Sequence, residues 1–537
     1  MNSTSNSLTR RLRALGQSAS SQMWAQALAG RRIGLEKESL RVTPAGRIAA
    51  TPHPPGLGAP LTHPHITTDF SEALIELITP PLGEPAAVLD FLADLHTLVY
   101  RQLGDEFLWG ASMPCDLEGA RDIPLARYGT SNAATMKTVY RRGLGNRYGR
   151  TMQAIAGVHF NFSFGDDFWR LYQDLDRDGE GDRGPLVDFR SEAYMGMIRN
   201  LQRIGWLVPY LFGASPTVCR SFVQGRETDL LPFDAETLYF PFATSLRMGD
   251  IGYQNQQEQC TGIKANYDSL DAYIRSLTWA IETRCPQYER LGVKVGDRYE
   301  QLSANVLQIE NEYYSTVRPK QVIDWLEKPT LALRRRGIRY VELRSLDVNA
   351  FEPGGVGMEP LLFLETLMLY CLLCDSPRIG SAEREAIDEN QVLTAHRGRE
   401  PGLCLHRDGE PVALDRWAAA VLDAMGPVAE LLDGGAAGPR AAALALQQAK
   451  VQDPDLTPSA RMLAELRTAG EGFAGLAHRL SLAHRERFAR PLSRERETLF
   501  AELAAASIRR REEIEAADDL DFDHFLARYF AQGRAVE

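Results

Sequence analysis

The sequence predicts an α+β fold, in which a mostly antiparallel sheet surrounded by helices is followed by a helix-rich C-terminal third. Three observations support this prediction. Five segments before residue 350 alternate polar residues with β-branched or aromatic ones, which is the period of a strand. Stretches with helical spacing separate these segments. From about residue 358 onward, helical patterns take over almost completely.

The expected elements follow one another in a simple order. The strands are 31–42 (RRIGLEKESLRV), 72–79 (EALIELIT), 156–164 (AGVHFNFSF), 305–314 (NVLQIENEYY) and 338–348 (IRYVELRSLDV). The helices are 86–103, 191–212, 358–374, 414–432, 440–450 and most of 459–517, and the most linker-like stretch is 174–185. We expect an N-terminal leader and helix at 1–33, a sheet-bearing catalytic portion at 34–357, and a helix-rich portion at 358–537 that packs on it and is not independent.

The composition is that of an ordinary globular protein and excludes several classes. The chain has 537 residues, of which 44% are hydrophobic and 24% charged, and its net charge is -11. This charge argues against nucleic acid as a partner, and no apolar run approaches the ~20 residues that span a bilayer. Seven cysteines in so long a chain do not form the pattern of a secreted disulfide framework. A cytoplasmic location is expected, without a membrane partner.

The N-terminal segment permits two interpretations. No acidic residue occurs between Met1 and Gly34, and arginines are mixed with serines there, which is the composition of a transit peptide. Leu8, Leu12 and Leu15 also fall at helical spacing, which indicates a frayed leader with an amphipathic helix. We favour the helix.

Carboxylates recur on one face of the predicted strands. Residues two apart in a strand point to the same side, so Glu36 and Glu38 share a face, as Glu342 does with Arg344. The same alternation groups these further residues: Glu72 with Glu76, His159 with Asn161 and Ser163, and Gln308 with Glu310 and Glu312.

Two readings of these faces remain open. A solvated sheet surface also alternates, but such surfaces favour threonine, lysine and mixed charge, whereas these faces have almost no lysine. If the acids line one sheet, they repel one another unless cations lie between them, and carboxylate oxygens are ligands of Mg²⁺ or Mn²⁺. Acid-held Mg²⁺ is typical of phosphoryl transfer. GxxxxGK[ST] is absent, so no motif identifies a nucleotide or a substrate.

The motifs, taken in order, resemble one known family. They are GLEKESLRV, ITTDFSEALIELITP, YGTSNAATMKTVYRRGLGNRYG, MQAIAGVHFNFS, PYLFGASPTVC, FATSLRMGDIGY, LQIENEYYSTVRPK and YVELRSLDVNAF, with DPDLTPSARML further on. Together they resemble the proteobacterial class of glutamate–cysteine ligase, from about Gly34 into the C-terminal helices.

The resemblance implies a fold and a reaction. The fold would be glutamine-synthetase-like, with an antiparallel sheet curled into a funnel that holds Mg²⁺ or, in its place, Mn²⁺. ATP, a co-substrate, would phosphorylate the γ-carboxylate of L-glutamate, and the amine of L-cysteine would displace phosphate. This is the first step of glutathione biosynthesis. A monomer acting on small molecules is expected.

The resemblance also implies roles for individual residues. The expected metal ligands are Glu36, Glu38, Asp69, Glu76, His159 and Glu342. Imidazole suits Mn²⁺ better than Mg²⁺, so His159 could instead be a hydrogen-bonded histidine on a polar face. Arg247 and Arg344 would hold the glutamate carboxylate and the transferring phosphoryl group, or act as counter-ions for the acids. The adenine-contacting residues are not indicated.

The expected cysteine pocket is less charged. Its lining would be Phe70, Tyr140, Leu144, Tyr253 and Tyr314. Three alternatives remain beside the leading hypothesis: a ligase that joins glutamate to another amine, a metal-dependent phosphate-ester hydrolase using the same acids, and a non-catalytic metal-binding protein.

Overall fold

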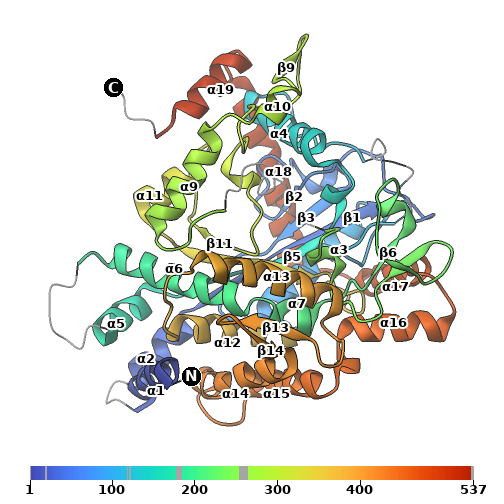
Figure 1. The fold of residues 1–537 in the computed structure, drawn as a ribbon. Helices are drawn as coiled ribbons and strands as arrows, with labels where there is room; N and C mark the ends of the chain where they lie inside the picture. Colours follow the sequence, from blue (N-terminus) through green and yellow to red (C-terminus); the bar gives the residue numbers. More distant parts are fainter. Residues whose placement is uncertain are drawn as a thin grey trace.

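A central antiparallel sheet organises the molecule. The structure, a computed structural model, describes residues 2–17, 21–115, 117, 119, 123–176, 184–252 and 264–533. Figure 1 shows the sheet across the middle of the molecule, with α6, α7 and α12 on one side and α9 and α19 towards the other. The predicted α+β class, with a helix-rich C-terminal third, is confirmed.

Within the described ranges the sheet has seven strands in the order β11-β12-β5-β1-β3-β2, and β4 pairs with β1. Their bounds are β1 Arg32–Val42, β2 Ile66–Thr68, β3 Leu74–Ile78, β4 Phe107–Leu108, β5 Gly157–Ser163, β11 Val317–Lys320 and β12 Tyr340–Asp347. All pairs are antiparallel. Four of the five predicted strands are therefore present, close to their expected bounds.

The register gathers the predicted acids on one face. Glu36 pairs with His159, and Glu38 pairs with Glu76. Glu342 pairs with Asn161 on β5. We call the sheet side that carries Glu36, Glu38, Glu76, His159 and Glu342 the acidic face. Because side chains alternate along a strand, the opposite side carries buried apolar residues, for example Leu35, Leu77, Phe160 and Leu343.

Helices cover the apolar side. Contacts connect α3 with β1 and β3, α6 with β11, and α7 with β12. Among the described residues before 358, the α-helices are α1 Asn2–Gln17, α2 Ser21–Ala29, α3 Pro85–Tyr100, α4 Asn132–Tyr148, α5 Asp166–Asp176, α6 Leu186–Ile204, α7 Leu207–Phe212, α9 Leu270–Glu282, α10 Pro286–Glu289 and α11 Pro329–Arg336. The predicted single helix at 191–212 is wrong at its centre, because the chain turns at Gly205 and Trp206 between α6 and α7.

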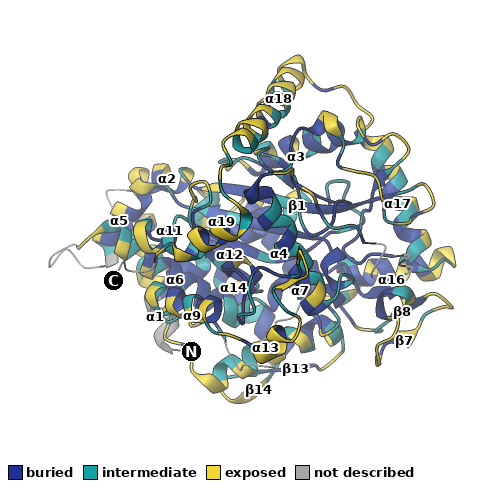
Figure 2. Cartoon of the chain, turned by 90° about the horizontal axis from the view of Figure 1, so that it is seen from above, coloured by how far each residue is buried: buried dark blue, intermediate teal, exposed yellow. Residues whose placement is uncertain are grey.

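The last third is helical, as predicted. Its helices are α12 Met358–Leu373, α13 Ser381–Arg397, α14 Leu414–Asp433, α15 Pro439–Gln452, α16 Pro458–Ala469, α17 Phe473–Phe488, α18 Arg494–Ala516 and α19 Phe522–Ala531. Small sheets are formed by β6 Thr217–Cys219, β7 Leu231–Pro232 and β8 Thr237–Tyr239, by β9 Lys294–Val295 and β10 Arg298–Tyr299, and by β13 Cys404–Arg407 and β14 Glu410–Ala413. Figure 2 shows α12 and β1 mainly buried, whereas α18 has a long exposed face.

One hydrophobic cluster joins the sheet to the C-terminal helices, running from Leu8 in α1 to Phe500 in α18. A buried ion-pair group reinforces it. Glu365 on α12 accepts hydrogen bonds from Arg31 at 2.6 Å and from Arg440 at 2.7 Å. Glu365 thereby connects the start of the sheet to α15.

The predicted strand at 305–314 is wrong. This segment contains bends and a 3-10 helix, η6 (Glu310–Glu312). Glu312 accepts a hydrogen bond from the Gln308 amide at 2.6 Å, which folds the segment back on itself. Arg147 from α4 donates to the same carboxylate at 2.9 Å, so Glu312 is held away from the acidic face. The predicted linker at 174–185 begins as the end of α5, and residues 177–183 lie outside the described ranges.

The N-terminal leucines occupy a helix, α1, in which Leu8 and Leu15 are buried. Cys115 and Cys219 form a disulfide that links the segment after β4 to β6. Cys371 and Cys374 are buried and free. Among the helices described, none combines the length and apolar character needed to cross a bilayer.

Candidate active site

The acidic face brings ligand-type atoms from three strands within reach of one ion. One oxygen or nitrogen from each of Glu36, Glu76 and His159 lies within 4.8 Å of the other two. Asn161 donates to Glu36 at 2.9 Å and keeps that carboxylate turned towards the group. These strands are adjacent because β1 lies between β3 and β5, so Glu36, Glu76 and His159 lie close together, and their role as metal ligands stays a prediction.

Two of the carboxyls hold their protons unusually tightly. Burial, with the nearby charge of Asp69, raises the pKa of Glu38 from 4.5 to about 8. Burial and the charge of Glu36 raise the pKa of Glu76 well above its ordinary value. Glu38 also accepts a hydrogen bond from the Gly157 amide at 2.7 Å. Without a bound cation, the ionised forms of both carboxyls are therefore disfavoured.

Glu342 has a different environment, because cations surround it. Lys320 Nζ lies 3.4 Å and Arg344 Nη1 3.2 Å from Glu342 Oε1. Burial would raise the pKa of Glu342, but these charges hold it well below its ordinary value. Lys320 was not predicted as a site residue, because it lies on β11, a four-residue edge strand that was itself not predicted. Within the described part of the chain, Glu342 Oε2 is buried and has no hydrogen-bond partner.

His159 lies between the acids and Arg344. Its Nδ1 is 3.2 Å from Glu36 Oε2 and 3.3 Å from Arg344 Nη1, and its Nε2 is 3.9 Å from Glu38 Oε1. Burial, followed by the charge of Arg344, lowers the pKa of His159, so the ring is neutral at pH 7. A proton on Nδ1, donated to Glu36, leaves the Nε2 lone pair facing Glu38. This lone pair and an ionised Glu38 could together bind a cation, which would then replace the proton on Glu38.

The two predicted arginines lie at the same edge of the site. Arg344 is on β12, and Arg247 belongs to a short 3-10 helix, η5 (Leu246–Met248). Arg247 Nη2 donates to the Arg344 carbonyl at 2.9 Å. Burial opposes the charge of Arg344, but the Glu342 carboxylate raises its pKa above the ordinary value, so the guanidinium stays charged.

The sixth predicted metal ligand, Asp69, lies beside this centre. Asp69 follows β2 with its side chain 40% exposed, and one of its oxygens is 3.9 Å from Arg141. It is not part of the three-residue group, although its charge acts on Glu38 and Glu76.

The residues predicted to line a cysteine pocket lie on different elements, and their role stays a prediction. Tyr140 and Leu144 lie on α4, and Phe70 packs against that helix beside Gly145. Tyr314 lies near Arg247 and Arg344, with its hydroxyl 3.5 Å from Met248 Sδ. Tyr253 lies outside the described residues.

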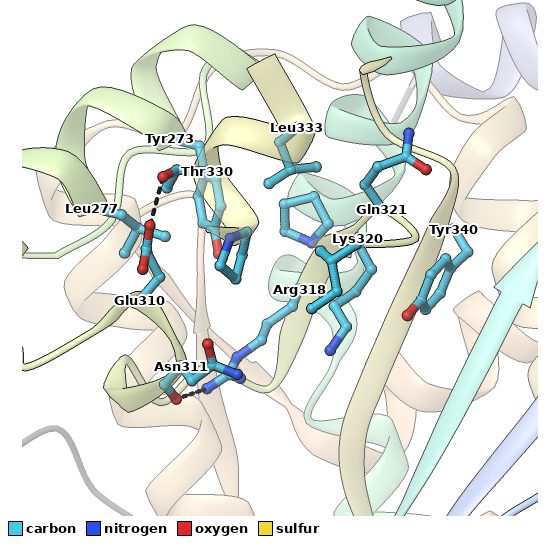
Figure 3. A pocket seen from close by; sticks show the side chains of 13 residues that line it. Tyr273, Leu277, Glu310, Asn311, Arg318, Lys320, Gln321, Thr330, Leu333 and Tyr340 are labelled. Atoms are coloured by element: carbon cyan, nitrogen blue, oxygen red, sulfur yellow. Dashed lines mark hydrogen bonds between the residues drawn. The ribbon is translucent and has the colours of Figure 1, made fainter. Parts of the chain in front are cut away.

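A cavity of about 120 Å³ opens beside the acidic face. Figure 3 shows Tyr273 and Leu277 of α9 and Leu333 of α11 along one wall, and Arg318, Lys320 and Tyr340 near the other. Within the cavity lining, the Thr330 hydroxyl donates a hydrogen bond to Glu310 Oε1 at 2.6 Å. Lys320 contributes to both sites, because it lines the cavity and approaches Glu342.

Comparisons with known proteins identify the family of this chain. The family model described as glutamate-cysteine ligase matches residues 17–393. A curated glutamate–cysteine ligase from Alcanivorax borkumensis is 49% identical over 94% of this chain and 97% of its own. One from Pseudomonas entomophila is 45% identical over 99% of this chain and 98% of its own. A crystal structure of glutamate–cysteine ligase from Francisella tularensis in complex with AMP has a TM-score of 0.87 and 33% identity, over 93% of this chain and 97% of that one.

The antiparallel sheet and its acid- and arginine-bearing face define a ligase with a glutamine-synthetase-like fold. The chain belongs to the glutamate–cysteine ligase family.

Proposed function

We propose that this chain joins the γ-carboxylate of L-glutamate to the amine of L-cysteine at the expense of ATP, in the cytoplasm and as a monomer. The observation that carries the proposal is the convergence of Glu36, Glu76 and His159 next to Arg247 and Arg344, in a family member.

The donor set fits divalent cations. Glu36, Glu38, Glu76, His159 and Glu342 would hold them, and Asp69 could approach from its loop. Glu342 Oε2 is buried without a hydrogen-bond partner among the described residues, and the ionisation of Glu38 and Glu76 is unfavourable, so both observations favour a cation there. When bound, Mg²⁺ supplies charge neutralisation for ATP phosphates, and Mn²⁺ suits the imidazole better.

The arginines provide binding and orientation. Arg344 is positively charged and directed towards the acids, so it can bind the transferring phosphoryl group, while Arg247 can bind a glutamate carboxylate through its guanidinium fork. A γ-carboxylate oxygen attacks the γ-phosphorus and ADP departs. The cysteine nitrogen then attacks the carbonyl carbon, phosphate departs, and an amide forms.

The nucleotide base would occupy the cavity of Figure 3. Its wall offers two aromatic rings, Tyr273 and Tyr340, and the aliphatic Leu277 and Leu333, which suit a flat base. Arg318 and Lys320 lie between this cavity and the acidic face, so they would hold phosphates along the path to Glu342. The AMP in the Francisella tularensis relative supports a nucleotide-binding site.

Phe70, Tyr140, Leu144 and Tyr314 would line the cysteine pocket, with Tyr253. An apolar slot discriminates one small group by only ~1–3 kcal/mol, so some 2-aminobutyrate should be accepted.

The test is phosphate release with ATP and Mg²⁺, adding glutamate and cysteine separately and together. Full release is expected only with both amino acids. Release from a phosphate ester without glutamate would indicate a hydrolase, and equal release with many amines would indicate another carboxylate–amine ligase. No release under any combination would leave a metal-binding protein.

A further inference from the structure

The Arg247 guanidinium is placed by residues that were not expected to have a role in the site. Arg247 is only 1% exposed and reaches the sheet from η5, outside it. Its Nη2 donates to the Arg344 carbonyl at 2.9 Å, and its Nη1 lies 3.8 Å from Asp347 Oδ1. A carboxylate at that distance attracts the guanidinium towards the end of β12.

Asp347 also fastens the loops that carry Arg247. It is the last residue of β12, and its carboxylate accepts hydrogen bonds from the Ala214 amide at 2.8 Å, Ser215 Oγ at 2.7 Å and Ser245 Oγ at 2.9 Å. Ser245 Oγ in turn accepts from the Met248 amide at 3.3 Å and caps η5. One buried carboxylate therefore connects η5 to the sheet.

Gly157 provides the space that the guanidinium occupies. A Cβ atom placed on Gly157 would lie 2.0 Å from Arg247 Nη2. The Gly157 backbone amide donates a hydrogen bond to Glu38 Oε2 at 2.7 Å. The other side of this residue, which has no side chain, faces the Arg247 guanidinium. Any side chain would push the guanidinium off the sheet.

We propose that Asp347 and Gly157 are positioning residues that set the place of the Arg247 guanidinium and thereby the affinity of the site for glutamate. Neither is assigned to bind substrate. The inference rests on the proposed role of Arg247. Asp347 holds the guanidinium from the end of β12, and Gly157 leaves the surface over which it lies.

The test is steady-state kinetics of Asp347→Asn, Arg247→Ala and the double variant, with Glu365→Gln as a matched control. Glu365 is another buried carboxylate paired with arginines, and it lies on α12 with partners, Arg31 and Arg440, that have no proposed role in the site. Losing a charge-assisted contact is expected to raise KM for glutamate about tenfold or more in Asp347→Asn, with a smaller change in kcat. Glu365→Gln should lower thermal stability and leave KM for glutamate unchanged. The double variant should be no worse than Arg247→Ala alone.

Multiplying effects in the double variant would overturn the proposal, since Asp347 would then act independently of Arg247. A normal KM for glutamate in Arg247→Ala would instead refute the proposed role of Arg247, which is a separate outcome.

Gly157→Ala keeps the inference testable if Asp347→Asn does not fold. Residue 157 has no left-handed backbone, so alanine is tolerated there by the strand. We expect Gly157→Ala to raise KM for glutamate, and to have little further effect in Arg247→Lys, whose side chain lacks Nη2. An unchanged KM for glutamate in Gly157→Ala, or an equal further increase in Arg247→Lys, would contradict the proposal.

Discussion

Replacing Glu38 by glutamine should stabilise the protein when metal is removed, although it removes a proposed ligand. Burial raises the pKa of Glu38 from 4.5 to about 8. At pH 7 the folded, metal-free protein therefore keeps a proton that the unfolded chain has released. Holding that proton 2.5 pH units above the ordinary pKa of 4.5 costs about 3 kcal/mol, at about 1.4 kcal/mol per unit. Glutamine is neutral in both states and avoids this cost.

The sign of the pH dependence follows from the same shift. Between pH 4.5 and about 8 the folded state binds more protons at residue 38 than the unfolded state, so the free energy of unfolding falls as the pH rises. The advantage of Glu38→Gln should grow by about 1.4 kcal/mol per pH unit between pH 5 and 7. Denaturant unfolding in EDTA at pH 5, 6 and 7 measures it. Adding Mg²⁺ should stabilise the wild type more than the variant.

A difference between wild type and Glu38→Gln that does not change with pH would refute this reasoning, and so would a variant that is less stable in EDTA at pH 7.

Four further predictions concern Glu342, Lys320, the proposed cysteine pocket and the C-terminal helices. Glu342→Gln should have the opposite effect and destabilise the metal-free protein at pH 7, because Lys320 and Arg344 hold the pKa of Glu342 low; stability above wild type in the same unfolding assay would contradict this. Lys320→Met should raise KM for ATP about tenfold with little change in KM for cysteine, measured by phosphate release, and an equal increase for both substrates would argue against a phosphate contact. The wild type should use 2-aminobutyrate measurably and alanine poorly, and equal turnover of alanine and cysteine would exclude the proposed apolar pocket. Residues 358–537 expressed alone should show no cooperative thermal unfolding by circular dichroism. The reason is that the ion pair between Glu365 and Arg31 and the shared hydrophobic cluster both cross the boundary at residue 358. A sharp thermal transition would show that these residues form an independent unit.

The strands that were predicted correctly are those in which polar and apolar residues alternate because one face of the sheet is acidic and the other is packed in the core. In β1, acids point to one side and Leu35 and Lys37 to the other, so both the strand and the grouping of Glu36 with Glu38 could be read directly. The segment 305–314 shows the same alternation for another reason. There Glu312 pairs with Arg147 from α4, a partner more than a hundred residues away that no local pattern reveals.

The cations of the site were harder to predict than its acids. Lys320 lies on β11, whose four residues are too few to give a periodic signal. In the sequence, Asp347 is only the last polar residue of a predicted strand. Its proposed positioning role depends on hydrogen bonds from residues 214, 215 and 245, which come close to it only in the folded protein. The sequence predicted strand faces rich in acids and almost free of lysine. This prediction was incomplete, because Lys320 lies next to Glu342.

The central place of β1 has a consequence for insertions and deletions. β1 pairs with β5 from Arg32 to Lys37 and with β3 from Glu36 to Leu40. Gaining or losing a single residue at its middle would therefore shift half of the strand by one position relative to a neighbour. Glu36 or Glu38 would then turn into the layer of leucine and phenylalanine beneath the sheet, where a lone carboxylate is costly. Length changes should therefore be excluded from residues 32–42, while the exposed tip between β13 and β14, far from this strand, can lengthen freely.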